Sequence, residues 1–255
     1  MLFDLRGQVA LVTGASGGLG EAIALAYASH GADLVLSDRN VEALEAVAVR
    51  CRATGIRASI VAADLGDVGH AEALGSQAAA VFGRIDTLVC NAGIQGTAGP
   101  TLSISRDEWE RVFQVNVASA HALCSALVPE MAARGAGRVI LMASIAALRG
   151  NRAIGLYGMT KAALSQLARN IAVEWGPRGV SANAIAPGFI RTPLATELMA
   201  NEVFMARRLA MTPLRRVGEP HEIAGVAVML AASAGAFITG QTLVIDGGTL
   251  ISDGS

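Results

Sequence analysis

Short β-branched apolar runs alternate with longer alanine- and leucine-rich segments along almost the whole chain. The short runs are typical of strands that are buried on both faces, and the longer segments have the spacing of helices that cover them. Repeated alternation of this kind implies parallel strands joined by right-handed crossovers. The sequence therefore predicts an α/β fold, a doubly wound parallel sheet of about seven strands with helices on both faces.

The order of these segments gives the predicted elements. Predicted strands cover residues 8–13, 33–37, 58–62, 86–90, 137–143, 180–185 and 243–245. Predicted helices cover residues 18–29, 41–53, 71–82, 155–175 and 222–232, and residues 108–134 hold one or two more. No linker, repeat or shift in composition divides the chain, so we expect one domain over residues 1–255.

Residues 191–216 interrupt this alternation. They carry a Thr-Pro pair at 192–193 and another at 212–213. Prolines that bound a short helical piece indicate an excursion from the sheet, because a proline favours the start or the end of a helix over its interior. We expect this segment to form a flap over a substrate pocket.

The composition argues against two classes of partner. Hydrophobic residues make up 53% of the chain, and 20 Lys and Arg residues are balanced by 21 Asp and Glu residues, which leaves a net charge of -1. This balance provides no electrostatic footprint for nucleic acid or for an anionic membrane. The charge-free run 223–245 is long enough to span a membrane, but polar residues and glycines interrupt it. We expect a buried helix, a turn and a buried strand there.

The cysteines and the N-terminus predict a cytoplasmic protein. Cys51, Cys90 and Cys124 are odd in number and widely spaced, which favours reduced thiols over disulfides. The N-terminus has no basic region followed by an apolar run, so we expect no signal peptide. The histidines show no metal-ligand spacing, and no metal site is expected.

A glycine-rich turn lies between the first predicted strand and the first predicted helix. It contains Gly14, Ser16, Gly18, Leu19 and Gly20. Glycines let the backbone turn tightly and approach a ligand, and the helix N-terminus adds free N–H groups and partial positive charge. A plain strand-to-helix turn also uses glycines, but the position directly after the first strand favours dinucleotide binding.

Asp38 follows the second predicted strand, where an acidic residue can bind the ribose hydroxyls of adenosine. A carboxylate at this position repels a 2′-phosphate, so NAD is favoured as the cofactor over NADP. Arg39 complicates this preference, because a guanidinium could pair with a phosphate or stack on adenine. The alternative role of Asp38 is to cap the following helix, which Asn40 could do instead.

Tyr157 and Lys161 are four residues apart in the predicted helix 155–175, and Ser144 lies upstream. This spacing places the phenol and the ammonium on the same face of a helix. A nearby positive charge stabilises the phenolate and lowers the pKa of a phenol, which is ordinarily about 10. The same pair is also common as a surface feature, so the rest of the chain must decide its role.

Several motifs occur in one order along the chain: Thr13-Gly14-x-x-x-Gly18-x-Gly20, Asp64, Asn91-Ala92-Gly93, Asn116, Ser144, Tyr157-x-x-x-Lys161 and Pro187-Gly188. Taken together, they resemble the short-chain dehydrogenase/reductase family over essentially the whole length. The resemblance implies a Rossmann-type fold, NAD(P)-dependent conversion of a small secondary alcohol or ketone, and a homotetramer. Long helices that look apolar on more than one face agree with such an assembly.

The resemblance implies roles for four catalytic residues. Tyr157 would be the general acid or base that exchanges a proton with the substrate oxygen, and Ser144 would hold that oxygen by a hydrogen bond. Lys161 would lower the pKa of the phenol and bind the nicotinamide ribose. Asn116 would disturb its helix and hold a water that links Lys161 to solvent. The structural alternative for Asn116 is an amide that satisfies local backbone groups.

The resemblance also implies a set of cofactor-positioning residues after the third, fourth and sixth predicted strands. They are Asp64, Leu65, Asn91, Ala92, Gly93, Pro187, Gly188, Ile190 and Thr192. Asp64 would contact the adenine, and Thr192 would bond the carboxamide and so orient one nicotinamide face for hydride transfer. Tyr157 and Lys161 are expected to contact the cofactor as well.

Arg149, Asn151 and Arg152 lie between the predicted catalytic serine and tyrosine, so their loop borders the reaction site. We expect the pocket to accept a polar alcohol or carbonyl compound, such as a sugar derivative or a hydroxy acid. The alternative is that both arginines face solvent or a neighbouring subunit.

Three functions other than an NAD-dependent alcohol dehydrogenase fit parts of the same sequence. An NADPH-dependent 3-oxoacyl-carrier-protein reductase would share the fold, but Asp38 disfavours its usual cofactor. A nucleotide-sensing protein without turnover would not need the complete catalytic set. An enoyl reductase is disfavoured because related enzymes of that kind space the tyrosine and the lysine more widely.

Overall fold

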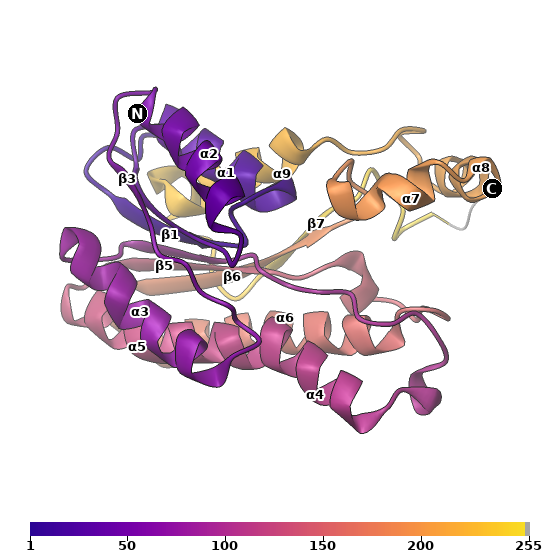
Figure 1. The fold of residues 1–255 in the computed structure, drawn as a ribbon. Helices are drawn as coiled ribbons and strands as arrows, with labels where there is room; N and C mark the ends of the chain where they lie inside the picture. The colour runs from indigo at the N-terminus through magenta and orange to yellow at the C-terminus, as the bar shows by residue number, and fades with distance from the viewer. Residues whose placement is uncertain (253–255) are drawn as a thin grey trace.

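Residues 1–252, which the computed structural model describes, contain one parallel sheet of seven strands in the order β3-β2-β1-β4-β5-β6-β7 (Figure 1). The strands are β1 (Val9–Thr13), β2 (Asp33–Ser37), β3 (Ala58–Ile60), β4 (Thr87–Cys90), β5 (Gly137–Met142), β6 (Val180–Pro187) and β7 (Thr242–Ile245). The predicted α/β fold is confirmed. The strand order reverses between β1 and β4, and ligands bind at such a switch point beyond the carboxyl ends of the strands.

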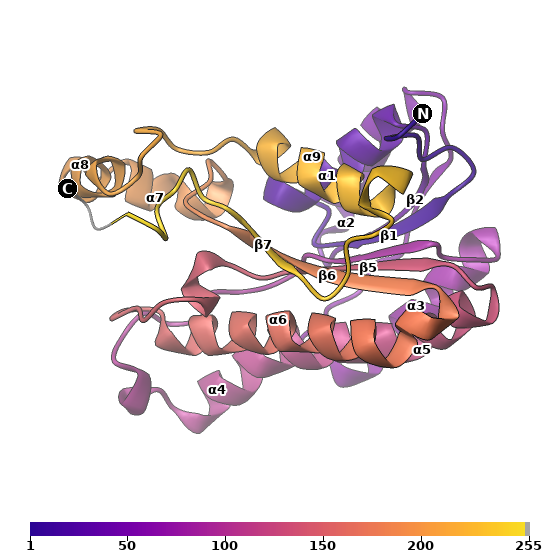
Figure 2. The ribbon, with the colours of Figure 1, turned by 180° about the vertical axis from the view of Figure 1, so that it is seen from behind.

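Helices cover both faces of the sheet. The α-helices are α1 (Gly18–Ser29), α2 (Val41–Arg52), α3 (Val68–Phe82), α4 (Arg106–Phe113), α5 (Ser119–Ala133), α6 (Gly155–Trp175), α7 (Thr196–Met199), α8 (Glu202–Ala210) and α9 (Pro220–Ala231). Short 3₁₀ turns cover Thr101–Ser103, Ile145–Ala147, Gly176–Arg178, Pro193–Ala195 and Ser233–Gly235. Helices α1, α2 and α9 lie on one face, and α3, α5 and α6 lie on the other (Figures 1 and 2).

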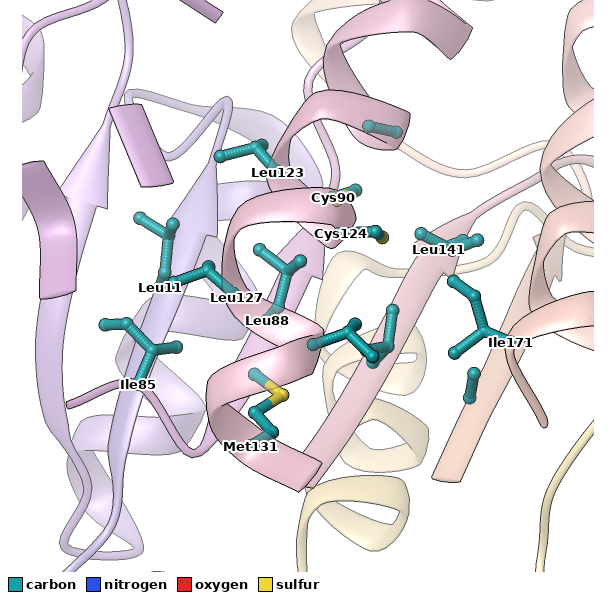
Figure 3. Close-up of a cluster of buried hydrophobic side chains, with 14 of the residues drawn as sticks. Leu11, Ile85, Leu88, Cys90, Leu123, Cys124, Leu127, Met131, Leu141 and Ile171 are labelled. Carbon is teal, nitrogen blue, oxygen red and sulfur yellow. The ribbon is translucent and has the colours of Figure 1, made fainter. Parts of the chain in front are cut away.

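Each face of the sheet has its own hydrophobic core, because successive side chains of a strand point to opposite faces. On one face Leu11 and Leu88 pack with Leu127 and Met131 of α5, and all four side chains are buried (Figure 3). On the other face the buried side chains of α1, α2 and α9 pack against the alternate positions of the strands. Burial on both faces explains why the strands read as nearly continuous apolar runs.

Most predicted elements are confirmed, with small differences at their ends. Strand β6 continues to Pro187, which a strand tolerates at its end. Helix α3 begins at Val68, before the predicted start, because the Asp67 side chain accepts a hydrogen bond from the His70 N–H and caps the helix. The run 223–245 forms a helix, a turn and a strand as expected, but β7 is at the sheet edge and is only half-buried.

The segment predicted to hold one or two helices forms one continuous run, Arg106–Ala133, in which the π-helical segment Gln114–Ala118 joins α4 to α5. By length and composition this run could cross a membrane, with a mean hydropathy of 1.3 over its most apolar window. In the structure it packs on the sheet, where Leu123 and Leu127 are buried (Figure 3). The core therefore accounts for part of its apolar character, since 44% of that window is buried.

Residues 191–216 leave the sheet, as the prolines predicted. Helices α7 and α8 lie in this segment and project beyond the carboxyl ends of the strands (orange in Figures 1 and 2). Helix α8 begins after Asn201, whose side chain accepts a hydrogen bond from the Phe204 N–H. The excursion is observed, and its role as a flap remains a prediction.

Gly75 provides a test of the packing between α3 and α5. A β-carbon at Gly75 would lie 2.6 Å from Cβ of Ala126, so we expect Gly75→Ala to lower the free energy of unfolding by about 1–3 kcal/mol. Gly225 in α9 is the matched control, because it is exposed and a β-carbon there would meet nothing within 4 Å. Gly225→Ala should raise the free energy of unfolding by up to about 1 kcal/mol through helix propensity. Urea unfolding followed by circular dichroism measures both; equal effects would contradict the close packing.

Candidate active site

A cavity of about 800 Å³ opens at the carboxyl ends of the strands. Its walls come from the turn after β1, from segments that follow β2 to β6, from the start of α6 and from the segment of α7 and α8. The predicted site residues that line it are Gly14, Ser16, Gly18, Leu19, Asp38, Arg39, Asp64, Leu65, Asn91, Ala92, Gly93, Ser144, Arg149, Asn151, Tyr157, Lys161, Pro187, Gly188, Ile190 and Thr192. Gly20, Asn116 and Arg152 are not part of the lining.

The turn after β1 has the backbone that a phosphate cradle needs. Gly14 and Gly18 have φ angles of 64° and 57°, in the left-handed region that glycine adopts readily. A β-carbon at Gly14 would also lie 2.8 Å from Cα of Ala92. A β-carbon at Gly17 would meet nothing within 4 Å, and Gly17 begins α1 without a side-chain cap. The turn therefore offers room and free helix N–H groups, which fit a dinucleotide pyrophosphate.

Asp38 lies directly after β2, with its carboxylate held by its neighbours. Its Oδ2 accepts a hydrogen bond from Ser16 Oγ at 2.7 Å, and its Oδ1 accepts one from the Arg39 N–H at 2.7 Å. Asn40 caps α2 by accepting a hydrogen bond from the Ala43 N–H, so Asp38 is not used as the helix cap. The carboxylate is thus fixed at the cavity wall.

Asn91 ties the glycine turn to β4. Its Nδ2 donates hydrogen bonds to the main-chain oxygens of Thr13 at 3.0 Å and Gly14 at 3.1 Å. In return Thr13 Oγ1 accepts hydrogen bonds from the N–H groups of Asn91 and Ala92. These bonds fix the position of the turn relative to the sheet edge. They agree with the expected role of Asn91 as support for sheet and cofactor site.

Ser144 and Tyr157 line the same wall of the cavity. Ser144 follows β5, and its Oγ accepts a hydrogen bond from the Ala146 N–H at 3.1 Å. Tyr157 lies in the first turn of α6. Burial raises the pKa of the Tyr157 phenol, and the hydrogen bond with Ser144 opposes this shift only in part. Burial penalises the phenolate more strongly than Ser144 stabilises it. The expected lowering of this pKa by Lys161 stays a prediction.

Lys161 lies buried beside this phenol. Its side chain is 3% exposed, and Nζ lies 5.4 Å from the centroid of the Tyr157 ring. Nζ donates a hydrogen bond to the main-chain oxygen of Met142, the last residue of β5, at 2.8 Å. Burial lowers the pKa of Lys161 to about 8, because the interior disfavours the charged ammonium.

Asn116 lies behind the cavity in the π-helical segment and is 1% exposed. Its Oδ1 accepts a hydrogen bond from the Ile94 N–H at 2.8 Å, and its Nδ2 donates to the Ile94 main-chain oxygen at 2.9 Å and to Thr160 Oγ1 at 3.0 Å. The expected disturbance of the helix is present. The amide satisfies backbone groups, as the structural alternative states, and the water relay stays a prediction.

Asn116 also lies close to Lys161. A β-carbon at Gly93 would be 3.1 Å from Lys161 Nζ and 3.2 Å from Asn116 Oδ1. A side chain at this point would crowd both groups. Gly93 therefore has a packing role in addition to the expected cofactor contact.

The substrate end differs from the prediction in two residues. Arg152 is exposed and does not line the cavity, because the loop turns at Asn151, whose Oδ1 accepts hydrogen bonds from the main-chain N–H groups of the next turn. Arg149 is half-buried and does line it. Arg208 of α8 also lines the cavity and was missed, because nothing in the sequence distinguishes it from the adjacent Arg207.

The geometry agrees with comparisons to known proteins. A family model described as Enoyl-(Acyl carrier protein) reductase matches residues 14–249. The structure of a short-chain type dehydrogenase/reductase from Mycobacterium marinum has the same fold, with a TM-score of 0.90 and 34% identity over 97% of both chains. The chain belongs to the short-chain dehydrogenase/reductase family. The residues that carried the resemblance thus meet at one cavity of a short-chain dehydrogenase/reductase.

Two gluconate 5-dehydrogenases are similar to this short-chain dehydrogenase/reductase over their whole length. The enzyme from Gluconobacter oxydans (strain 621H) is 36% identical over 98% of each chain. The enzyme from Burkholderia cenocepacia J2315, whose structure is a complex with NADP and tartrate, is 33% identical over 98% of each chain, with a TM-score of 0.93.

The buried Lys161 makes the stability of this short-chain dehydrogenase/reductase depend on pH. The unfolded chain keeps the proton up to a pKa of 10.5, whereas the folded protein loses it at about 8. Between these values the unfolded state binds more protons, so this group makes the free energy of unfolding rise with pH, by up to about 3 kcal/mol. The variant Lys161→Met has no ionisable group at this position, so its free energy of unfolding lacks this rise with pH.

The measurement is urea unfolding of both proteins from pH 7.5 to 10. We expect the free energy of unfolding of the native protein, minus that of Lys161→Met, to increase across this range. The thiols and the phenol titrate in both proteins, so most of their effect cancels in the difference. A difference that stays flat or decreases would show that the ammonium is not destabilised by burial.

Proposed function

We propose that the chain interconverts a secondary alcohol and a ketone by hydride transfer to or from a nicotinamide cofactor. The observation that carries this proposal is the meeting of Ser144, Tyr157 and Lys161 in the cavity that also contains the glycine turn. One cavity therefore joins a pyrophosphate cradle to a proton donor, and family membership supports the same reaction class. The expected homotetramer and the cytoplasmic location remain predictions.

Tyr157 and Ser144 have separate roles in the proposed reaction. NAD(P), when bound, supplies the hydride acceptor or donor. Tyr157 carries its proton at neutral pH, as any phenol with a pKa of about 10 or above does, and it is the group that would donate a proton to a ketone oxygen. The Ala146 N–H occupies an acceptor site of Ser144 Oγ, and the hydroxyl proton, which the hydrogen bond with Tyr157 uses in the protein alone, would turn to the same substrate oxygen. In alcohol oxidation the proton returns to Tyr157.

NAD is the proposed cofactor in preference to NADP. The Asp38 carboxylate is fixed by Ser16 and the Arg39 N–H at the position where it would accept hydrogen bonds from the ribose hydroxyls and repel a 2′-phosphate. The Burkholderia enzyme holds NADP, so likeness to that enzyme does not by itself favour NAD. The proposed preference for NAD over NADP therefore depends on the Asp38 carboxylate.

The proposed substrate is a polar alcohol or ketone of the hydroxy-acid or sugar-acid type. Two relatives of similar length are gluconate 5-dehydrogenases, and gluconate is a polyhydroxy carboxylate. The half-buried Arg149 lines the cavity in the loop that follows Ser144, which supports a polar and anionic substrate. Arg152 is exposed outside the cavity and is not proposed to bind the substrate.

Tyr157→Phe is the test of the reaction. Removal of the hydroxyl removes the proton donor and keeps the ring packing, so we expect kcat to fall by about 100-fold or more. The dissociation constant for NADH should change by only a few-fold, because the glycine turn is untouched. Steady-state rates with NADH or NADPH and a panel of ketones, aldehydes and hydroxy acids give the first value, and NADH fluorescence titration gives the second. Retention of near-native kcat would overturn the proposed function.

Asp38→Ser is the test of the cofactor preference. Loss of the carboxylate removes the repulsion of a 2′-phosphate and leaves Arg39 beside it, so the ratio of kcat/KM for NADPH to that for NADH should rise by about 10- to 100-fold. Glu42→Ser is the matched control, since Glu42 is an exposed acid in the first turn of α2 and does not line the cavity. A native protein that already prefers NADPH would refute the assignment of NAD.

A further inference from the structure

At one end of the cavity, Arg149 and Arg208 have no acidic partner among residues 1–252. Arg149 lies in the loop after β5, and Arg208 lies in α8. Neither forms an ion pair within residues 1–252. The acidic residues of the lining are Asp38 and Asp64, which follow β2 and β3 on the other half of the sheet. Both acidic side chains of the lining, together with Arg39, therefore lie at one end of the cavity, and Arg149 and Arg208 lie at the other.

Several neighbouring arginines do have an acidic partner. In and beside the segment of α7 and α8, Arg191 pairs with Glu219 at 2.9 Å and Arg216 pairs with Glu222 at 2.5 Å. Arg111, which also lines the cavity, pairs with Glu108 at 2.8 Å. Acidic partners are thus present for several arginines around the cavity, whereas Arg149 and Arg208, like Arg39, form no ion pair in the part of the chain that the structure describes.

The Arg208 guanidinium is held in a defined place by two aromatic rings. Its central carbon lies 5.4 Å from the ring centroid of Phe189 and 5.5 Å from that of Phe204. The two rings contact each other edge to face, with their centroids 5.5 Å apart. Phe189 follows β6 and Phe204 belongs to α8, so these contacts also tie the helix to the sheet edge.

Burial against these rings leaves the charge of Arg208 poorly solvated. Burial lowers the pKa of Arg208, and the positive charges of Arg149 and Arg207 lower it further. A guanidinium remains charged even so, and ring faces compensate only part of the lost hydration. Two cations that share one end of a cavity are stabilised when an anion binds between them.

We propose that Arg208, together with Arg149, binds the carboxylate of the substrate. This inference rests on the proposed function and narrows its substrate to a hydroxy acid or the corresponding keto acid. A guanidinium presents a planar fork of N–H donors that matches a carboxylate, and the phenylalanine rings hold that fork in a fixed orientation. The carboxylates at the other end of the cavity repel the same group, so the substrate acid is directed to the end with Arg149 and Arg208.

The test compares Arg208→Gln with the matched control Arg207→Gln. Arg207 is the preceding residue of the same helix, is exposed and does not line the cavity. D-gluconate and D-glucitol serve as probes, because they differ only in the carboxylate, and D-glucitol 6-phosphate carries an anion of another class. Binding to the enzyme–NADH complex is followed by nucleotide fluorescence, which needs no turnover, and KM and kcat are measured for each probe that reacts.

We expect the native protein to bind gluconate more tightly than glucitol, and Arg208→Gln to weaken gluconate binding by about 10- to 100-fold while glucitol changes by less than about 3-fold. Any effect on turnover should appear in KM rather than in kcat. Arg208→Lys should restore part of the affinity, and Arg207→Gln should match the native protein.

Three results would overturn the assignment. They are equal binding of gluconate and glucitol to the native protein, equal loss for both probes in Arg208→Gln, or a preference for the phosphate over the carboxylate. Each of them leaves the Tyr157→Phe result untouched, because that variant reports on proton transfer with whichever alcohol or ketone reacts. Failure of the substrate assignment is therefore distinguishable from failure of the proposed function.

Discussion

The buried amide of Asn116 joins three segments that are far apart in the sequence, and the geometry of the catalytic wall depends on it. The amide pairs with both main-chain groups of Ile94 after β4 and donates to the Thr160 hydroxyl in α6. Thr160 Oγ1 donates in turn to the main-chain oxygen of Tyr157 at 2.8 Å. The amide uses three of its four hydrogen-bonding positions in these contacts, so its orientation is determined. Asn116 lies in a π-helical turn, which interrupts the regular α-helical hydrogen bonding at the point where the amide points inward. These hydrogen bonds hold the first turns of α6, which carry Tyr157, next to the carboxyl end of the sheet.

The charges of the cavity follow from the same arrangement of strands. Because all strands are parallel, the residues that follow them gather at one edge, and their order in the sheet decides which charges become neighbours. Asp38 and Asp64 follow β2 and β3, and Lys161 lies under the end of β5 with the Met142 carbonyl as its acceptor. Arg208 completes the basic half from α8. A ligand that fits such a cavity has separate parts for the two halves, as a dinucleotide beside an anionic substrate does.

The sequence predicted the sheet, most of its elements and the glycine turn because these depend on local pattern: apolar runs, helical spacing and backbone freedom at Gly14 and Gly18. The role expected of Tyr157 and Lys161 came from the joint order of the motifs along the chain, because their spacing on one helix face is also common at protein surfaces. Residues whose role depends on tertiary contacts could not be assigned in this way. Arg149 and Arg152 look alike in the sequence, and only the turn of the loop exposes one of them. Arg208 differs from its neighbours only through Phe189, which is distant in the sequence.

The predicted effect of Lys161 on the pKa of Tyr157 depends on the charge of Lys161, and burial bears on that charge. In the protein alone the pKa of Lys161 is about 8, whereas the pKa of Tyr157 is raised, so the lysine loses its proton first as the pH increases. A neutral amine cannot stabilise a phenolate. A ligand that places hydrogen-bond acceptors against Nζ favours the ammonium and raises the pKa of Lys161, and the restored charge then lowers that of Tyr157. We therefore expect activation of the phenol only in the ligand-bound site, because Lys161 is buried and has no carboxylate partner within residues 1–252.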